Sequence, residues 1–297
     1  MTKAVVTGGA GFIGSHVTDL LIDLGWEVTV FDDLSSGHRS NVQPAAAFIE
    51  GSILDLDCLT LAVNGADYVF HLAALPRIQP SFDDPIAHEM VNVVGTINCV
   101  EAARRNPLTK KLVISSSSAC YGTPETVPTS EEAEIAPLSP YALQKYSAEQ
   151  YSLILGARYD VPVVCLRYFN VYGPRSFNAN DPLSAYSSVI GVFKDQANAG
   201  LPITVTGDGS QSRDFVHVRD VAQANLLAST SSVSGEIFNV GSGRSVTVNE
   251  LAAMFSDRIT HIEERGGEAR TTRANIEKIQ LALGWEPRID LEEGIAE

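Results

Sequence analysis

The sequence has few positive charges for its length. Its 297 residues contain 21 Lys and Arg against 36 Asp and Glu, which gives a formal net charge of -15. A negative surface repels nucleic acid and anionic membranes, so the overall charge argues against either as a partner. If the substrate is an anion, individual arginines must hold it.

Long apolar runs are also missing. None approaches the length of about 18 residues that is needed to span a bilayer. We expect no secretory leader and a soluble cytoplasmic protein without a membrane partner. The 44% hydrophobic content is enough for a full core, in one large α/β unit or in a large and a small domain.

Cysteine and histidine are sparse and scattered. The four cysteines, Cys58, Cys99, Cys120 and Cys165, lack the spacing of metal ligands, and the six histidines form no cluster. We therefore expect reduced thiols in or near the core and no metal site. His71 ends an apolar stretch and is expected to pack or to hydrogen-bond rather than to bind a ligand.

The sequence does contain a regular alternation of β-rich and helical segments up to about residue 170. The expected strands are 4–7, 28–32, 47–50, 68–72, 111–115 and 161–169, and the expected helices are 13–24, 55–63, 85–105 and 141–159. Such alternation requires right-handed crossovers, so it predicts an α/β fold with a doubly wound parallel sheet, the Rossmann arrangement. Ligands of such a sheet bind beyond the carboxyl ends of its strands.

The pattern changes after Asn170. A loop leads into an expected helix at 183–199, followed by short strands at 203–206 and 237–240, a strand-then-helix segment at 215–229, and helices near 248–255, 275–283 and 291–297. We predict a smaller α/β substrate domain, partly interleaved with the first. The larger domain takes 1–169, joined by about 214–243, and the smaller takes 170–213 and 244–297.

A glycine-rich turn, Gly8-x-x-Gly11-x-x-Gly14, separates the first expected strand from the first helix. Glycine at these positions allows a tight turn, a close approach of the backbone to a ligand and close helix packing, while free N–H groups and the helix dipole face an anion. Asp32 ends the next strand, where a carboxylate can bind the adenosine ribose hydroxyls of a dinucleotide. Asp32 and Asp33 would repel a 2′-phosphate, so NAD is favoured over NADP.

Tyr141 and Lys145 are one helical turn apart and share a helix face. A free tyrosine has a pKa of about 10, and a neighbouring lysine cation lowers that pKa by favouring the phenolate. Such pairs are commonly solvent-exposed and have no catalytic role, but this one follows four serines, Ser115 to Ser118, at the end of a strand. A serine hydroxyl there can hydrogen-bond a substrate oxygen, although loop or cap roles account for at least two of the four.

Further motifs run along the chain: His71-Leu72-Ala73-Ala74, Asn92 before Gly95-Thr96, Tyr121-Gly122, Leu166-Arg167-Tyr168-Phe169-Asn170-Val171-Tyr172-Gly173-Pro174, Arg213-Asp214-Phe215-Val216-His217-Val218, Asn239-Val240-Gly241 and Leu283-Gly284-Trp285. Together with the glycine turn, Asp32 and the Tyr141-x-x-x-Lys145 pair, they make the chain resemble the extended short-chain dehydrogenase/reductase family. Within that family the chain is similar to the NAD-dependent nucleotide-sugar 4-epimerases. The resemblance covers essentially the whole chain.

The resemblance implies that the larger domain binds NAD and the smaller a UDP-sugar. It assigns the pyrophosphate to Gly8, Gly11, Phe12, Ile13 and Gly14, and the adenosine to Asp32, Asp33, Ser35, Ser36 and Gly37. Ser52, where many relatives have Asp, and Ile53 would flank the adenine. The remaining cofactor residues would be Leu72, Ala73, Ala74, Asn92, Ser115, Tyr141, Lys145 and Tyr168. The substrate residues would be Ser117, Tyr141, Asn170, Val189, Thr204, Thr206, Arg213, Arg265, Glu268 and Thr272.

The implied reaction uses Ser117, Tyr141 and Lys145 as catalytic residues. Tyr141 as phenolate removes the proton of the sugar 4′-hydroxyl, Ser117 hydrogen-bonds that oxygen, and the C4′ hydride passes to NAD. The 4-keto sugar then turns over and takes the hydride back on its other face. This redox cycle epimerises C4′ without net oxidation.

Two features bear on the identity of the sugar. Relatives restricted to UDP-glucose and UDP-galactose tend to have a bulky residue where Thr272 stands, and a small side chain leaves room for a 2-acetamido group. The segment Asn180 to Ile190 also looks like that of epimerases acting on N-acetylated sugars. We expect the UDP-N-acetylglucosamine/UDP-N-acetylgalactosamine pair as substrates, with the non-acetylated pair as a further possibility.

Other functions stay open. A nucleotide-sugar 4,6-dehydratase needs an acid and a base, which relatives supply as Asp-Glu where Ser118 and Ala119 stand here, so this reading is disfavoured. A UDP-glucuronate 4-epimerase needs only a different sugar pocket. A non-catalytic NAD-binding sensor would not need Ser117, Tyr141 and Lys145. As in the family, we expect a homodimer paired through the helices at 85–105 and 141–159.

Overall fold

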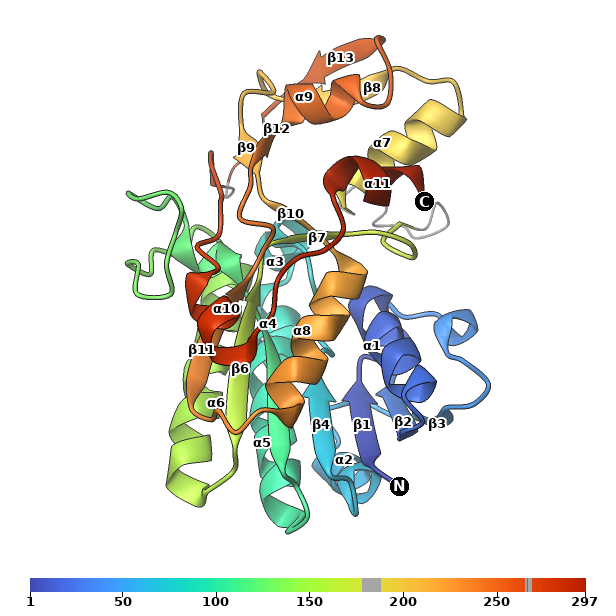
Figure 1. Ribbon diagram of the computed structural model, residues 1–297, viewed down its shortest axis with the longest axis vertical. Helices are drawn as coiled ribbons and strands as arrows, with labels where there is room; N and C mark the ends of the chain where they lie inside the picture. The colour runs from blue at the N-terminus through green and yellow to red at the C-terminus, as the bar shows by residue number, and fades with distance from the viewer. Residues whose placement is uncertain (178–187, 265, 267–268) are drawn as a thin grey trace.

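A computed structural model describes residues 1–177, 188–264, 266 and 269–297, and its central element is a seven-stranded sheet (Figure 1). Every neighbouring pair of strands in this sheet is parallel. From one edge to the other the strands are β3 (Ala47–Glu50), β2 (Glu27–Asp32), β1 (Lys3–Thr7), β4 (Tyr68–His71), β5 (Lys111–Ser117), β6 (Val163–Tyr168) and β11 (Glu236–Val240). The direction of winding reverses between β1 and β4, and a crevice opens at such a switch point.

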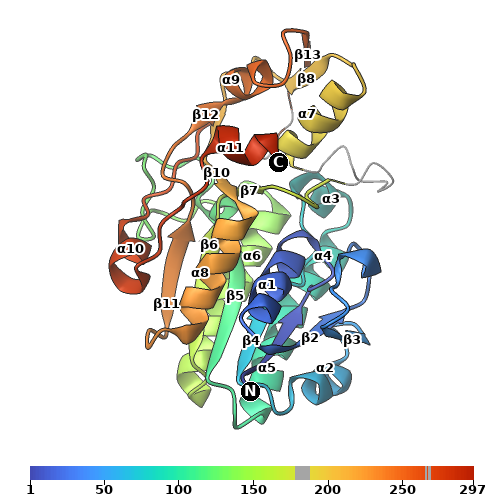
Figure 2. The ribbon, with the colours of Figure 1, turned by 45° about the vertical axis from the view of Figure 1, so that its right-hand side comes forward.

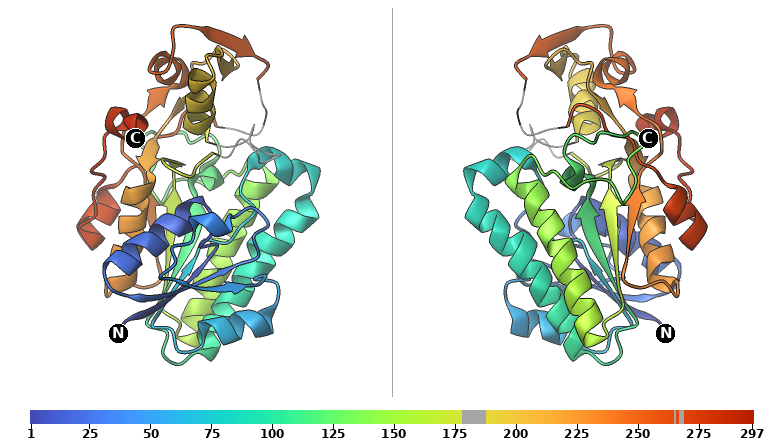
Figure 3. Two further views of the ribbon diagram at one scale, coloured as in Figure 1. Left: turned by 90° about the vertical axis from the view of Figure 1, so that its right-hand side faces the viewer. Right: turned by 90° about the vertical axis from the view of Figure 1, so that its left-hand side faces the viewer.

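Helices cover both faces of the sheet. One face carries α1 (Phe12–Asp23) and α8 (Val218–Thr230), which lie side by side (Figure 2), and the other carries α2 (Leu56–Val63), α5 (Gly95–Arg105) and α6 (Pro140–Tyr159) (Figure 3). Strand β5 shows why: Leu112 and Ile114 belong to the core cluster on the α5 side, whereas Val113 belongs to the cluster under α1 and α8. The doubly wound α/β fold expected from the sequence is confirmed.

A second group of elements lies beyond the carboxyl ends of the strands (Figure 1). It comprises β7 (Asn170–Tyr172) paired with β10 (Phe215–His217), β9 (Ser212–Arg213) with β12 (Val246–Thr247), β8 (Ile203–Thr206) with β13 (Ile259–Ile262), and the helices α7 (Val189–Asn198), α9 (Val248–Ala253) and α11 (Leu291–Ala296). These elements share a separate apolar cluster that includes Phe193 and Leu251. The chain returns to the large sheet through α8 and β11, and α10 (Glu277–Leu283) packs on β11. The division into two domains stays a prediction.

Several elements differ from the sequence-based expectation. The single helix expected at 85–105 consists of α4 (Pro85–Glu89), a π-helical turn (Met90–Val94) and α5, preceded by the short helix α3 (Ile78–Asp83). Short 3₁₀ turns occupy Arg39–Asn41 and Ser118–Tyr121. Of the helix expected at 183–199, residues 183–187 lie outside the described residues, and α7 begins at Val189.

The described parts of the chain contain no helix that is both long and apolar enough to cross a bilayer. They also contain no group of three or more His, Cys, Asp or Glu residues that could hold a metal ion. The four cysteines are free thiols as expected. Cys99, Cys120 and Cys165 are buried, and Cys58 is half-buried.

Candidate active site

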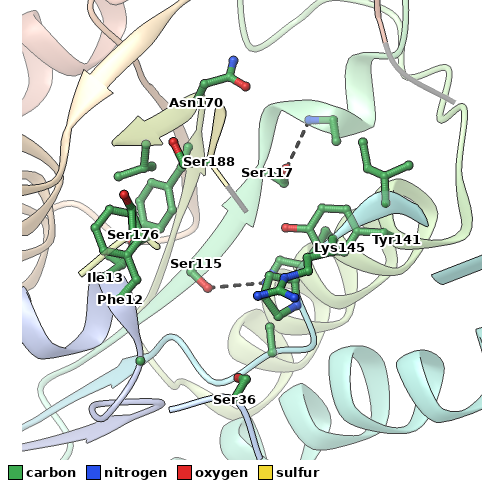
Figure 4. A pocket seen from close by; sticks show the side chains of 18 of the residues that line it. Phe12, Ile13, Ser36, Ser115, Ser117, Tyr141, Lys145, Asn170, Ser176 and Ser188 are labelled. Carbon is green, nitrogen blue, oxygen red and sulfur yellow. Dashed lines mark hydrogen bonds between the residues drawn. The ribbon is translucent and has the colours of Figure 1, made fainter. Parts of the chain in front are cut away.

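A cleft of about 1010 Å³ lies over the carboxyl ends of the sheet strands and extends to α7 and β8. Its walls bring together residues from the ends of β1, β2, β4, β5 and β6 with others from the smaller group of elements (Figure 4). Among the described residues that the sequence assigned to a site, only Ser52 and Asn92 do not line this cleft. Arg265 and Glu268 lie outside the described residues.

The glycine turn forms the floor of the cleft at the end of β1. Gly8 has a φ of +71°, and a Cβ there would lie 2.5 Å from the backbone nitrogen of Ala73. A Cβ on Gly14 would lie 2.1 Å from the carbonyl oxygen of Gly8, so neither position accepts a side chain without movement. Gly11 caps α1, whose first turn has neither a side-chain cap nor an acidic residue. The backbone N–H groups of this first turn are therefore available to an anion such as a pyrophosphate.

Asp32 sits at the end of β2 with its carboxylate held by the backbone. Its oxygens accept hydrogen bonds from the backbone N–H of Ala10 and of Leu34, each 2.9 Å long. Burial raises the pKa of Asp32, and these two hydrogen bonds oppose the rise. A carboxylate retains further acceptor sites beyond two hydrogen bonds, which suits ribose hydroxyls.

The loop after β2 completes this end of the cleft with Asp33, Ser35, Ser36 and Gly37. Arg39, the nearest arginine along the chain, stacks its guanidinium over the Phe48 ring, 4.5 Å from the centroid, and does not line the cleft. The glycine cradle, the open helix N-terminus and Asp32 together fit NAD, and among the described residues the loop from Asp33 to Asn41 brings no Lys or Arg into the cleft for a 2′-phosphate.

Asn92 lies behind the cleft wall rather than in it. Its side chain in the π-helical turn accepts a hydrogen bond from the backbone N–H of Leu75 (2.8 Å) and donates one to the carbonyl of the same residue (3.1 Å). It therefore fixes the segment that carries the lining residues Leu72, Ala73 and Ala74. Ser52 is likewise turned away, with its hydroxyl accepting from the backbone N–H of Leu54 (3.3 Å), whereas Ile53 does line the cleft.

His71 supports the same wall from inside the sheet and is fully buried. Thr96 donates its hydroxyl proton to the carbonyl of Asn92 (2.7 Å), so its oxygen accepts from Nε2 of His71 (2.9 Å). Nδ1 of His71 then accepts from the Thr7 hydroxyl (2.8 Å), and burial lowers the pKa of the imidazole to about 3. The expectation that His71 is a hydrogen-bonding residue is confirmed.

Ser115, Ser117, Tyr141 and Lys145 point into one part of the cleft, at the junction of β5 and α6 (Figure 4). Helix α6 starts there because Ser139 caps it, accepting from the N–H of Ala142 (3.2 Å), and Pro140 occupies its first turn. Lys145 donates to the Ser115 hydroxyl (3.4 Å), and the Tyr141 phenol lies beside Ser117, which acts to lower its pKa. Ser117 also accepts from the N–H of Ala119 (3.2 Å), which starts the next turn.

The two ionisable groups of this cluster differ from the sequence-based expectation. Burial lowers the pKa of Lys145 to about 8, a fall that Cys165 and Glu149 oppose. Burial also raises the pKa of Tyr141, against a smaller lowering by the Ser117 hydrogen bond. The expected lowering of the Tyr141 pKa is therefore wrong for this arrangement, because desolvation of the phenol outweighs the effect of its neighbours.

The opposite wall carries Tyr168, Asn170 and Thr272. The Tyr168 hydroxyl is buried and hydrogen-bonded to Asn225, which holds the ring at the end of β6. The half-buried Thr272 hydroxyl accepts from the N–H of Asp214 (3.2 Å) and from the Asn170 amide (3.4 Å).

Asp214, which the sequence motif contained but to which no role was assigned, anchors this wall. It accepts four hydrogen bonds, from Ser242 N (2.6 Å), Ser242 Oγ (2.7 Å), Gly243 N (3.0 Å) and Ala274 N (2.9 Å).

The far end of the cleft is built by the smaller group of elements. Val189, Thr204 and Thr206 line it, and Gln196 fixes Thr204 by hydrogen bonds to its hydroxyl (2.7 Å) and its N–H (3.0 Å). Arg213 also lines the cleft and donates to the carbonyls of Ser212 and Arg270.

Three arginines that were not predicted as site residues, Arg77, Arg175 and Arg270, line the cleft as well. The acidic composition already implied that local arginines would hold an anionic substrate. Arg175 pairs with Asp19 (2.8 Å) and Arg270 with Asp208 (3.2 Å). Because these pairings are set by the tertiary fold, the sequence did not indicate which arginines reach the cleft.

Comparison with known proteins places this geometry among relatives. Residues 4–241 match the family described as the NAD dependent epimerase/dehydratase family. A UDP-glucose 4-epimerase of Mycolicibacterium smegmatis is 37% identical over 99% of this chain and 96% of its own length.

Two solved structures share the whole fold. One is the UDP-glucose 4-epimerase of Thermotoga maritima with UDP-glucose, with a TM-score of 0.94 and 36% identity over 99% of this chain and 96% of that chain. The other is the UDP-N-acetylglucosamine 4-epimerase of Methanobrevibacter ruminantium M1 in complex with UDP-N-acetylmuramic acid, with a TM-score of 0.92 and 37% identity over the same shares of the two chains.

Proposed function

The chain belongs to the NAD dependent epimerase/dehydratase family, and from that starting point we propose that it epimerises C4 of a UDP-hexose through a 4-keto intermediate. The observation that carries the proposal is the cluster of Ser117, Tyr141 and Lys145 at the end of β5, beside a groove that fits NAD. Such a reaction needs a redox cofactor beside a general base.

Each residue of the cluster has a role in the proposed reaction. Tyr141 takes the proton of the sugar 4′-hydroxyl and later returns it, while Ser117 hydrogen-bonds the same oxygen. Lys145 has a pKa of about 8, and its cationic form, one helical turn from Tyr141, would favour the phenolate against the desolvation that raises the pKa of Tyr141. When bound, NAD accepts the C4′ hydride and returns it.

The proposed mechanism also requires the sugar to turn over while the nucleotide stays bound. The wall formed by Asn170, Arg213 and Thr272, together with Val189, Thr204 and Thr206, would hold the uridine diphosphate. Arg265 and Glu268, which lie outside the described residues, belong to the same proposal. Arginines suit the diphosphate because their fork of donors matches phosphate oxygens.

We take UDP-N-acetylglucosamine and UDP-N-acetylgalactosamine as the preferred pair. Thr272 lines the cleft with a small side chain, and Ser118, Ala119 and Gly122 line it close along the chain to Ser117. Small residues leave space for a 2-acetamido group, and the similar structure from Methanobrevibacter ruminantium M1 is of a UDP-N-acetylglucosamine 4-epimerase. Ser118 and Ala119 also supply no acid or base for a dehydratase.

The proposal includes a homodimer. Helix α4 and the π-helical turn, together with α6, expose apolar side chains around a small groove of about 370 Å³. Ile86, Met90 and Leu143 line it and are 76%, 43% and 54% exposed. An apolar surface of this kind on two adjacent helices suits pairing with a second copy.

The test is a proton NMR time course of the purified protein with UDP-N-acetylglucosamine, UDP-glucose or UDP-glucuronate in separate tubes, each with and without added NAD. We expect conversion of the acetylated sugar to its C4 epimer, faster than conversion of the plain sugar. Faster turnover of UDP-glucose or UDP-glucuronate would reassign the substrate. A 4-keto-6-deoxy product would indicate a dehydratase, and no reaction with any sugar would favour an NAD-binding sensor.

A further inference from the structure

The serine run of β5, Ser115 to Ser117, faces one row of side chains on α6. Ser115 accepts a hydrogen bond from Lys145, and Ser117 lies beside Tyr141, as described above. Ser116, between them, donates to Oε2 of Glu149 over 2.7 Å and is 3% exposed. Because Tyr141, Lys145 and Glu149 are spaced four residues apart, they form a single row on the helix. Glu149 is therefore a third residue in the row of Tyr141 and Lys145, and it is a buried carboxylate.

Glu149 is completely buried and fully bonded. Arg167 on β6 binds it with two parallel hydrogen bonds, Nε to Oε2 (2.9 Å) and Nη2 to Oε1 (2.7 Å), and Gln150 donates a third (3.2 Å). The Arg167 guanidinium is 2% exposed and also donates to the Tyr121 hydroxyl (2.8 Å). Two-point bonding of this type fixes the orientation of the carboxylate as well as its position.

We propose that Glu149 is a positioning residue for the reaction: held by Arg167, it fixes Ser116 and with it the register of the two flanking serines against Tyr141 and Lys145. This inference rests on the proposed function, since it assumes that the Tyr141 and Lys145 cluster performs the chemistry. Errors of about 1 Å in such a cluster reduce turnover strongly, so a rigid support behind it has a catalytic effect.

Glu149 also acts on Lys145 through its charge. The groups that face Lys145 are Glu149 on the same helix, Cys165 on β6, the neutral His71 on β4 and Tyr141. Among these, Glu149 is the carboxylate, and it raises the pKa of Lys145 against the larger lowering by burial. Loss of its charge would let Lys145 release its proton at lower pH.

The first experiment compares Ser116→Ala with Ser152→Ala. Ser152 is a matched control because it is also a buried serine, lies on α6 and donates only to the carbonyl of Ala148 (2.7 Å). We expect Ser116→Ala to lower kcat by roughly tenfold with KM and the Kd of NAD nearly unchanged, while Ser152→Ala keeps the parental kcat. Equal kcat values for the two variants, or a change confined to KM or NAD affinity, would overturn the proposal.

The second experiment measures the charge effect with Glu149→Gln. In protein labelled with ¹³C at the lysine side chain, the Lys145 resonance, assigned through Lys145→Arg, reports its pKa directly. We expect a midpoint roughly 0.5–1 pH unit lower in Glu149→Gln, and an equal shift of the alkaline limb of the kcat profile. An unchanged midpoint would refute the charge effect.

The two proposals fail in different ways. Absence of turnover by the parental protein contradicts the proposed function, whereas the NMR midpoint still decides whether Glu149 acts on Lys145. If Glu149→Gln does not fold because Arg167 loses its partner, Ser116→Ala, which leaves that ion pair intact, decides the question through kcat.

Discussion

The Tyr141 hydroxyl is the single group whose removal should separate chemistry from binding. We expect Tyr141→Phe to reduce turnover by roughly 10²- to 10⁴-fold, which is typical of a lost general acid/base. NAD should remain bound, because the glycine turn and Asp32 are proposed to hold other parts of the dinucleotide. The measurements are the epimerisation rate by NMR and the NAD content of the purified variant.

Tyr151→Phe is the control for this change, because Tyr151 lies on the same helix and is 47% exposed. It should keep the parental rate. Undiminished turnover in Tyr141→Phe would remove Tyr141 from the mechanism.

Thr272 is the residue on which the proposed choice of sugar depends. We expect Thr272→Tyr to depress kcat/KM for UDP-N-acetylglucosamine at least tenfold more than for UDP-glucose, roughly 1.4 kcal/mol of discrimination, because the ring would occupy the space for the acetamido group. Both substrates are measured by the same NMR time course.

The Thr272 hydroxyl also bonds Asp214 and Asn170, so the substitution removes hydrogen bonds as well as space. Thr272→Val separates the two effects, because it loses the hydroxyl and keeps the size. It should affect both sugars alike. Equal losses on both sugars in Thr272→Tyr would contradict the steric argument.

Residue chemistry was predictable from the sequence where it depends on local spacing and was not where it depends on the tertiary environment. The row of Tyr141 and Lys145 follows from helical periodicity, but the raised pKa of Tyr141 depends on burial that periodicity does not report. Similarly, the motif around Asn92 can be recognised in the sequence. The contact of Asn92 with Leu75 behind the cleft wall cannot, because it depends on the π-helical turn.

At the scale of elements, the close packing of the turn between β1 and α1 leaves no room for a side chain at Gly14. Its Cβ would meet the Gly8 carbonyl oxygen at 2.1 Å, whereas a Cβ on Gly11 would meet the same atom at 3.2 Å. We expect Gly14→Ala to lower the free energy of unfolding by about 1–3 kcal/mol and to weaken NAD binding at least tenfold.

Gly11→Ala is the graded control for stability and should lose much less free energy of unfolding, although it also lines the cleft and should weaken NAD binding. Alanine is otherwise favoured over glycine inside a helix by about 1 kcal/mol, so a loss in Gly14→Ala must come from the collision. The measurements are thermal unfolding and NAD titration, and equal destabilisation of the two variants would contradict the steric account.

Whole elements of the sheet were predictable because its central strands, such as β1, β5 and β6, are buried on both faces and therefore read as apolar runs. Strands β1 to β6 follow their predicted ranges closely. The short strands β7 and β13 were not predicted, since they are three and four residues long and obtain their pairing from distant segments. The split of the helix at 85–105 was missed because a π-helical turn has no composition of its own.

For the whole molecule, the position of the cleft explains how an acidic protein can hold an anion. Arg77 comes from the loop after β4, whereas Arg175, Arg213 and Arg270 come from segments that follow β6. These arginines therefore converge only when the two groups of elements are folded together. Arginines inside the cleft can act on an anion at short range, whereas salt screens the more distant surface charges that contribute to the net charge of -15.

The proposed homodimer is also a property of the whole molecule. The largely apolar groove formed by Pro85, Ile86, Met90, Pro140 and Leu143, which Glu89 and Gln144 also line, runs across α4, the π-helical turn and α6. Burying it against a second copy would remove exposed apolar area from water, which favours association. A charge placed in that surface would be desolvated without a partner, and this is strongly unfavourable.

We therefore expect Leu143→Glu to convert a dimer into a monomer at micromolar concentration, with the mass measured by size-exclusion chromatography and light scattering. Leu281→Glu is the matched control, because Leu281 is an 82% exposed leucine on α10, remote from the groove residues, and should leave the dimer intact. A monomeric parental protein, or dimers of equal stability in both variants, would show that this face is not the pairing surface. Since Tyr141 is two residues from Leu143 on α6, the monomer's turnover would then report whether pairing also steadies the catalytic helix.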